Sequence, residues 1–217
     1  MLFRSRASTK DYPGGFDGFF IAHLTPNEKG KAAQAAYKSI SNDNPEATCV
    51  GRPTPAAIVS TGGYIMKIEL KPEQKLAVIS SEWFNEVRTV YMDGRKHPDP
   101  KVRFVTGHSI GHWEGDTFVV ESSGYDDRSW LSQKNPDGGW IHSDEMKVVE
   151  RWHRTQYGRL EAEITVTDPK IYTGPWTVKG VEFLVPGAEL GEEFCVPSDY
   201  ADFNNEVFGR AANGDKK

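Results

Sequence analysis

Hydrophobic and polar residues alternate along most of the chain between positions 64 and 186, which is the pattern of half-buried β-strands. Eight segments carry it: 64–70, 76–83, 86–93, 109–114, 117–125, 145–154, 159–168 and 177–186. The alternation is clearest in 159–168, where Leu160, Ala162, Ile164 and Val166 are predicted to point inward. Short turns such as Gly115-Asp116 join neighbouring segments, so the strands are predicted to be antiparallel.

Eight sequential antiparallel strands favour a closed barrel, because closure removes exposed sheet edges and leaves an interior able to hold a small ligand. A two-sheet sandwich is the alternative, since strand count and periodicity do not separate the two. One helix is predicted before the strands: Thr25-Pro26-Asn27-Glu28 forms a capping box, and an alanine-rich stretch follows it to about Ile40. The loop 42–57, with three prolines, connects this helix to the strands.

The length of 217 residues suits one all-β domain. We expect a lead-in at 1–23, the helix and loop at 24–45, the barrel at 58–197 and a tail at 198–217. The net charge of −5 is spread along the chain with no basic stripe, so nucleic acid is not an expected partner. No apolar run is long enough to span a bilayer. Oligomeric state cannot be inferred from these patterns.

The start of the chain, MLFRSRASTKDYPGG, has basic residues but no apolar core, so no signal peptide is predicted in the chain as given. The protein would be periplasmic if a signal had been removed and cytoplasmic otherwise. Cys49 and Cys195 either form one disulfide or remain two buried thiols, depending on the redox environment.

The stretch 107–122, GHSIGHWEGDTFVVES, contains two histidines, a tryptophan and three carboxylates around a turn. His108 and His112 could bind a metal together only with a third ligand, and the uncertain strand register and the lack of a cysteine partner argue against one. Trp113 and Asp116 are better explained as structure, with Trp113 closing the barrel end and Asp116 stabilising its turn. We therefore predict no metal site.

His108 and His142 each lie where a loop meets a strand, and histidine exchanges its proton near neutral pH. The alternative for each is a structural hydrogen bond to the backbone. Residues 124–145 form a connection that is long for a meander, and we interpret it as a lid over the barrel mouth. In this lid Trp130 and Trp140 would offer apolar surface to a ligand, and the proton-transfer groups would be Asp127, His142 and Asp144.

Several polar residues are predicted to face inward. If Leu76 and Val78 point into the barrel, Ser80 and Glu82 do so too, and the face of Met146 and Val148 continues to Glu150 and Trp152. Buried carboxylates need partners, which Arg88 and Arg151 could supply as structural ion pairs or as anchors for a ligand oxygen. For Glu82, Arg88 and Tyr91 the structural and functional interpretations stand equal.

Nucleophilic catalysis has little support, because the chain has no G-x-S-x-G elbow and neither cysteine lies in an activating context. No glycine-rich phosphate loop precedes a helix. No cofactor is therefore expected.

Four segments carry a family resemblance: YMDGRKHP, GHSIGHWEGDTFVVES, HSDEMKVVERWHR and DPKIYTGPWT. Together they resemble a large group of bacterial proteins with a lipocalin-like barrel, often exported, in which the motif GHSIGxWEGDT recurs and no single activity is assigned. The resemblance covers about 24–195, and His112 departs from it because arginine is common at that position. It implies a lipocalin-like barrel of about eight strands with an N-terminal helix.

Two functions follow as hypotheses. The first is a cofactor-independent lyase or isomerase, of the dehydratase or cyclase type, acting on a small oxygenated and partly hydrophobic metabolite. In it His142, oriented by Asp144 or Asp127, and His108 exchange protons, while Arg88 and Tyr91 stabilise an oxyanion. The second is a binding or carrier protein for such a metabolite. In both, the ligand-binding residues are Trp130, Trp140, Glu82, Trp152 and Glu150.

Overall fold

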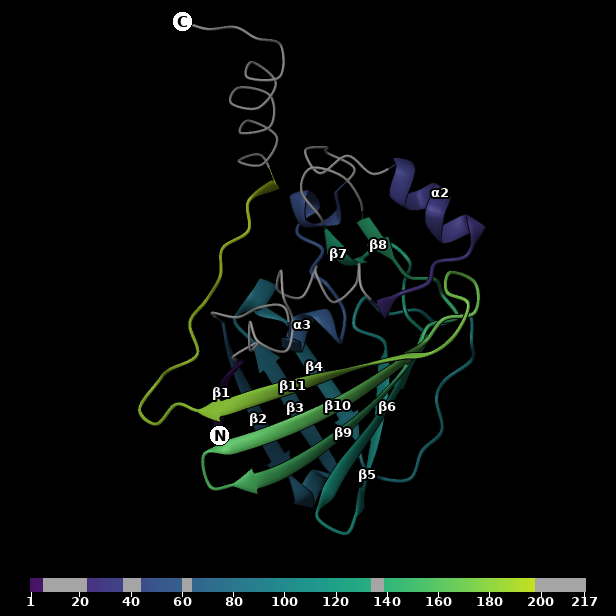
Figure 1. Cartoon of the computed structure of the whole chain (residues 1–217). Helices are drawn as coiled ribbons and strands as arrows, with labels where there is room; N and C mark the ends of the chain where they lie inside the picture. Colours follow the sequence, from purple (N-terminus) through teal and green to yellow (C-terminus); the bar gives the residue numbers. More distant parts are fainter. Residues whose placement is uncertain (6–22, 37–43, 60–63, 134–138, 198–217) are drawn as a thin grey trace, which may run out of the picture.

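The computed structural model describes residues 1–5, 23–36, 44–59, 64–133 and 139–197. Nine strands close a barrel in the order β1-β11-β10-β9-β6-β5-β4-β3-β2 (Figure 1). The barrel strands are β1 (Leu2–Ser5), β2 (Ile65–Lys71), β3 (Leu76–Ser81), β4 (Val87–Tyr91), β5 (His108–Glu114), β6 (Thr117–Ser123), β9 (Lys147–Gln156), β10 (Arg159–Thr167) and β11 (Trp176–Leu184). The predicted all-β barrel is confirmed, and closure rules out the two-sheet sandwich.

Two details of the strand prediction are wrong. β4 and β5 run parallel, with Val90 opposite Ser109 and Tyr91 opposite Ile110, because the long connection 92–107 carries the chain back across the barrel before β5 begins. The ninth strand is β1, from the segment expected to be only a lead-in. It pairs with both β2 and β11 and so closes the barrel.

The barrel interior is filled by alternate residues of each strand. The predicted inward faces of β9 and β10 are confirmed, since Val148, Glu150 and Trp152 are buried, as are Ala162, Ile164 and Val166. The face predicted for β3 is wrong: its buried residues are Ala77, Ile79 and Ser81. Residues 76–79 are apolar on both faces of the strand, so polarity alone could not fix which face points inward.

One end of the barrel, called here the capped end, is covered by α2 (Glu28–Ala36), α3 (Ala56–Val59) and the hairpin of β7 (Trp130–Gln133) and β8 (Gly139–Ile141) (Figure 1). The helix begins later than the capping box predicts, because Asn27 rather than Thr25 accepts a hydrogen bond from the Gly30 amide. The predicted end of the helix lies outside the described residues. The loop 42–57 contains the short 3₁₀ helix η1 (Pro45–Thr48) and the first residues of α3.

A disulfide joins Cys49, which follows η1, to Cys195 in the segment after β11. Of the two states that the sequence allowed, a disulfide or two buried thiols, the structure has the disulfide. The same C-terminal segment is held to the β3–β4 connection. The Glu193 carboxylate accepts hydrogen bonds from the Phe84 amide and the Tyr64 hydroxyl, and the Gly191 amide donates to Glu82. These contacts all lie at or near the capped end.

Candidate functional site

The opposite end of the barrel, called here the hairpin end, is where the connections 72–75, 115–116 and 157–158 join neighbouring strands (Figure 1). A recess of about 470 Å³ opens there. It is lined by residues from seven strands and two adjoining positions: Met1, Phe3, Ile68, Glu69, Leu70, Ile79, Trp113, Asp116, Phe118, Trp152, Arg154 and Leu160. Most of these residues are apolar, so this recess is a concave hydrophobic surface of the kind that binds small molecules.

Two exposed apolar side chains mark the recess. Leu70 is 52% exposed and Trp113 is 49% exposed, although four residues earlier on the same faces of their strands Met66 and Ser109 are buried. The Trp113 ring lies 5.1 Å from the ring of Phe118, which is itself buried. Trp113 therefore lies at a barrel end as predicted, but half of its surface remains open to solvent instead of forming core.

The buried Trp152 indole connects the recess to polar groups deeper in the barrel. Its Nε1 donates a hydrogen bond of 3.0 Å to Glu150 Oε2. Arg88 donates to both Glu150 oxygens, 2.8 Å from Nη2 to Oε2, and both residues are buried. Although burial opposes its charge, the Glu150 carboxylate raises the pKa of Arg88, so the guanidinium stays charged. The predicted buried Glu–Arg pair is thus present, whereas Arg151 lies on the outer wall and binds Glu114.

His142 lies at the capped end, almost fully buried beside the β7–β8 hairpin. Its Nε2 is 2.8 Å from the Ser129 hydroxyl, and its Nδ1 is 3.1 Å from the Ser143 carbonyl oxygen. A ring that donates from Nδ1 to this carbonyl accepts the Ser129 proton at Nε2. Burial lowers the pKa of His142, so the ring is neutral at pH 7.

A buried carboxylate fixes the loop beside this histidine. Asp168 accepts hydrogen bonds from the Ser143 amide at 2.6 Å and from the Ser143 hydroxyl at 2.7 Å. The sequence analysis assigned no role to Asp168 or Ser129. The sequence did contain one signal for Asp168, because this residue ends a clear strand pattern and precedes a proline. Nothing in the sequence pointed to Ser129.

The capped end holds two more polar groups, the half-buried Glu86 and the fully buried Tyr125. The Oε1 atom of Glu86 is buried and has no hydrogen-bond partner among the described residues. Burial raises the pKa of Glu86 to about 8, against the lowering effect of Arg88. Tyr125 is fully buried, and its ring lies 5.9 Å from the His142 ring in an edge-on arrangement. Glu86 is therefore largely protonated at neutral pH, which the sequence did not indicate.

His108 lies on the outer wall, at the start of β5. Its Nδ1 is 3.1 Å from Nδ1 of His97, and the Tyr91 ring stacks on it at 5.2 Å. The Arg95 guanidinium in turn covers Tyr91, 3.8 Å from the ring centre. Burial, together with the charges of His97 and Arg95, lowers the pKa of His108. His112 lies four residues along the same strand and contacts Glu114 instead, so the two histidines of the motif do not converge.

The remaining predicted site residues are spread over the capped end. The exposed carboxylate of Asp144 binds Arg103 and Lys170, which lower its pKa. Asp127 is exposed, Trp130 is half-buried and Trp140 is buried. Glu82 follows β3 and accepts a hydrogen bond from the Ile65 amide rather than pointing into the barrel as predicted.

The structure thus brings together Arg88, Glu150 and Trp152 inside the barrel, and Tyr91 with His108 on its outer wall. It places His142 in a separate group at the capped end. Of the residues that line the recess, Trp152 was predicted as ligand-binding, whereas Leu70, Trp113 and Phe118 were not. Their signal was an apolar strand end beside a tight turn, which by itself does not distinguish a binding surface from core.

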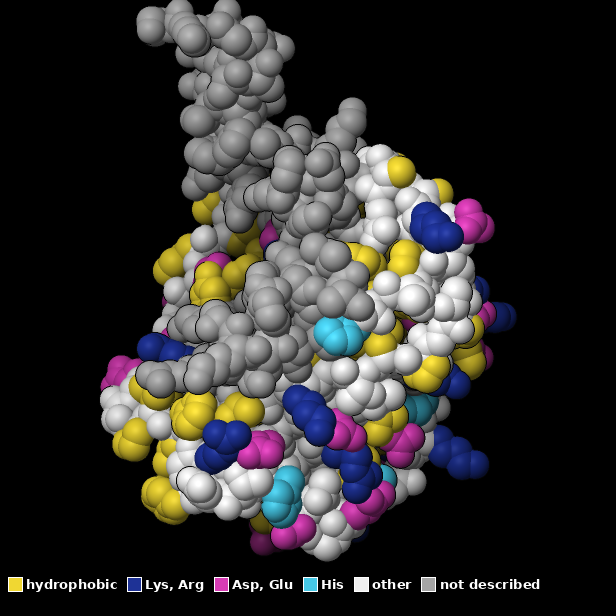
Figure 2. Space-filling model, viewed as in Figure 1, with side chains coloured by type: hydrophobic (Ala, Val, Ile, Leu, Met, Phe, Trp, Pro, Cys, Tyr) yellow, Lys and Arg dark blue, Asp and Glu magenta, His cyan; other side chains and the backbone are white. Residues whose placement is uncertain are grey.

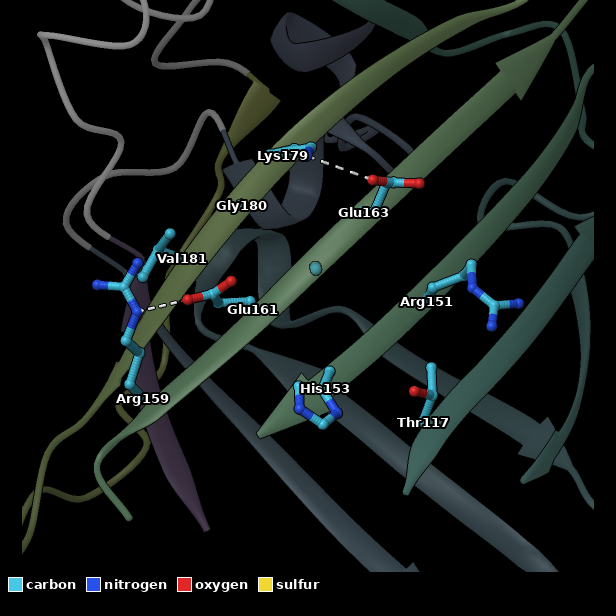
Figure 3. A pocket seen from close by; sticks show the side chains of 10 residues that line it. Thr117, Arg151, His153, Arg159, Glu161, Glu163, Lys179, Gly180 and Val181 are labelled. Carbon is cyan, nitrogen blue, oxygen red and sulfur yellow. Dashed lines mark hydrogen bonds and ion pairs between the residues drawn. The ribbon is translucent and has the colours of Figure 1, made fainter. Parts of the chain in front are cut away.

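Two further hollows lie on the outer wall. One, of about 540 Å³, crosses β6, β9, β10 and β11 (Figure 3). Charged side chains of both signs mix over this face (Figure 2), and they pair with one another, as Arg159 does with Glu161 and Lys179 with Glu163. The other, of about 620 Å³, lies between 97–103 and strands β6 and β9. Charges already paired in this way favour a solvated wall over a selective ligand site.

Among the described residues, no group of three or more histidine, cysteine, aspartate or glutamate side chains is arranged to hold a metal ion. None of the described helices has the length and apolar character needed to cross a membrane. The chain matches no known family model, no curated protein and no solved structure. The resemblance drawn from the sequence motifs therefore remains a prediction.

Proposed function

We propose that the protein binds a small, largely apolar molecule in the recess at the hairpin end of the barrel, as a binding or carrier protein. The observation that carries this proposal is the recess itself, a hollow of about 470 Å³ with aromatic and aliphatic lining and half-exposed Leu70 and Trp113. Large apolar side chains exposed together on a concave surface indicate a ligand site, because water contact with them is unfavourable.

The arrangement of the polar groups supports binding over catalysis at this recess. The titratable groups that line it are Glu69, Asp116 and Arg154, and none of the histidines proposed for proton transfer is among them. His142 belongs to the capped end and His108 to the outer wall. General acid–base catalysis needs its groups within hydrogen-bond reach of the ligand.

The test is titration with the uncharged fluorescent probe N-phenyl-1-naphthylamine. We expect one saturable site, and Leu70→Asp should weaken binding by about tenfold or more because it places a charge in the apolar lining. Val87→Asp is the matched control: Val87 is a similarly exposed aliphatic residue, 61% exposed, at the start of β4 near the capped end. Equal effects of the two substitutions, or no binding at all, would refute the proposal.

A second candidate is the cofactor-independent lyase or isomerase. It is favoured by one observation, the buried Oε1 of Glu86, which has no hydrogen-bond partner among the described residues and lies at the same end as Tyr125 and the Ser129–His142 pair. Burial raises the pKa of Glu86 to about 8, which favours its acid form. A carboxylic acid and a neutral imidazole can together donate and accept a proton.

This candidate is tested once a substrate is found. His142→Ala should abolish turnover while ligand affinity stays within about tenfold, because the lost interaction would belong to the transition state. Full activity in the variant would remove His142 from the mechanism.

A further inference from the structure

We infer that the ligand of the recess is an uncharged aromatic molecule that packs against Trp113 and Trp152. This inference rests on the proposed function and adds the chemical class of the ligand. Two features of the lining carry it: the aromatic side chains, and the balance of positive and negative charges among the lining groups.

The aromatic character comes from four rings contributed by four different strands: Phe3, Trp113, Phe118 and Trp152. The tilted contact between Trp113 and Phe118 leaves half of the Trp113 surface exposed. Aromatic pairs stabilise one another beyond the effect of buried area alone, by offset or edge-on contacts. A ligand ring could extend this contact by covering the exposed surface of Trp113.

The Trp152 ring is fixed in place from behind. Its Nε1 donates to Glu150, which Arg88 holds by two hydrogen bonds inside the barrel. Because this polar atom is used within the protein, Trp152 offers the recess its carbon surface. Because the Trp152 side chain is already fixed, little conformational entropy is lost when a ligand binds against it.

The charges around the recess are already engaged. Glu69 binds Lys67 at 3.1 Å, Asp116 lies 3.4 Å from His153 Nδ1, and Arg154 donates to the Tyr157 carbonyl oxygen. The Met1 ammonium likewise donates to the Ile68 carbonyl oxygen at 2.9 Å. Both signs are represented among these groups. The lining carries two carboxylates, Glu69 and Asp116, and two cations, Arg154 and the Met1 ammonium. A ligand ion would therefore meet a like charge as well as an opposite one, and burial of a charge that its surroundings do not match is unfavourable.

The experiment compares four matched ligands by calorimetry or by Trp fluorescence: 2-naphthalenemethanol, 2-naphthoate, 2-naphthylmethylammonium and the saturated decahydro-2-naphthalenemethanol. We expect the uncharged aromatic alcohol to bind about tenfold more tightly than either ion and about threefold more tightly than its saturated counterpart. Trp113→Leu should remove the preference for the aromatic over the saturated alcohol. Trp83→Leu, in the β3–β4 connection at the capped end, should retain it.

The outcomes separate this inference from the proposed function. If N-phenyl-1-naphthylamine binds at the recess but either ion binds as tightly as the alcohol, the ligand class is wrong while the binding function stands. If aromatic and saturated alcohols bind alike in the unmodified protein, the role given to Trp113 and Trp152 is also wrong. If no probe binds, the proposed function itself fails.

Discussion

Glu86 is a carboxylic acid whose surroundings disfavour its charged form, since its Oε1 is buried and its pKa is raised to about 8. A pKa raised on folding adds stability that is complete below the unfolded value, near 4.5, and is lost as pH rises through the folded value. We predict that between pH 5 and pH 9 the free energy of unfolding falls by about 2–4 kcal/mol more in the unmodified protein than in Glu86→Gln. Urea denaturation across this range measures the difference.

The control for this prediction is Glu73→Gln, in an exposed turn between β2 and β3. It should leave the pH dependence unchanged. Parallel pH profiles for Glu86→Gln and the unmodified protein would show that Glu86 ionises normally in the folded state.

The Arg88–Glu150 pair allows a second prediction at the residue scale. Arg88→Met leaves the Glu150 carboxylate buried beside Trp152 without its cation, which should lower the free energy of unfolding by about 3–5 kcal/mol. The double variant Arg88→Met/Glu150→Leu should recover most of that loss, because a buried ion pair and an apolar pair of similar size contribute similar amounts to the free energy of unfolding. Thermal or denaturant unfolding of the unmodified protein, the two single variants and the double variant gives the coupling free energy between Arg88 and Glu150. A double variant as unstable as the single one would mean that the pair holds the barrel together by more than charge compensation.

These residues show what side-chain chemistry could be predicted from the sequence. Alternation along 145–154 placed Glu150 inside the barrel, and a buried carboxylate requires a partner, so an arginine was expected. The raised pKa of Glu86 was not predictable, because it comes from burial, and burial depends on segments distant in sequence, such as the one at Gly51, where an added Cβ would lie 3.3 Å from Glu86 Oε1. Likewise, Ser129 and Asp168 meet near His142 only through the tertiary fold.

At the scale of elements, the strands were predictable and their pairing was less so. Long alternating segments such as β9 and β10 can be recognised as strands from their period of two, and the tight turn between them requires antiparallel pairing. β1 was missed because four residues are too few to establish a period. The parallel pairing of β4 with β5 was missed because the connection 92–107 contains no regular element that would show its direction.

The lid hairpin β7–β8 offers a prediction at this scale. Ser129→Ala removes the partner of His142 Nε2 in a buried place, which should cost about 1–3 kcal/mol and speed amide hydrogen exchange in β7 and β8. Ser80→Ala, half-buried on β3, is the control. Because the pKa of His142 is lowered by burial, the stability it contributes is held above pH 6.5 and lost as pH falls. The protection factors of the unmodified hairpin, which correct for the slower intrinsic exchange at low pH, should therefore also fall below that pH. Exchange in β7–β8 that is unaffected by both changes would show that the Ser129–His142 contact does not hold the lid.

At the scale of the whole molecule, the two ends of the barrel serve different purposes. The capped end is covered by α2, α3 and the lid hairpin, with the C-terminal segment lying against it, while the hairpin end exposes Leu70 and Trp113 around the recess. A rigid barrel closed at one end holds the shape of a ligand site at the other without requiring the caps to move. Stability and binding should therefore respond to different substitutions.

The Cys49–Cys195 disulfide tests this separation. It closes a loop of 146 residues and fastens the C-terminal segment near the capped end. Restricting so long a loop limits the unfolded chain, so Cys49→Ser/Cys195→Ser should lower the free energy of unfolding by about 2–4 kcal/mol in denaturant titrations. N-phenyl-1-naphthylamine should still bind the folded double variant with its affinity changed by less than about twofold. The disulfide and the recess are distant from each other, and substitutions at distant sites usually act independently. A large loss of affinity at a temperature where the variant is folded would mean that the C-terminal segment shapes the recess, and that the two ends of the barrel are coupled.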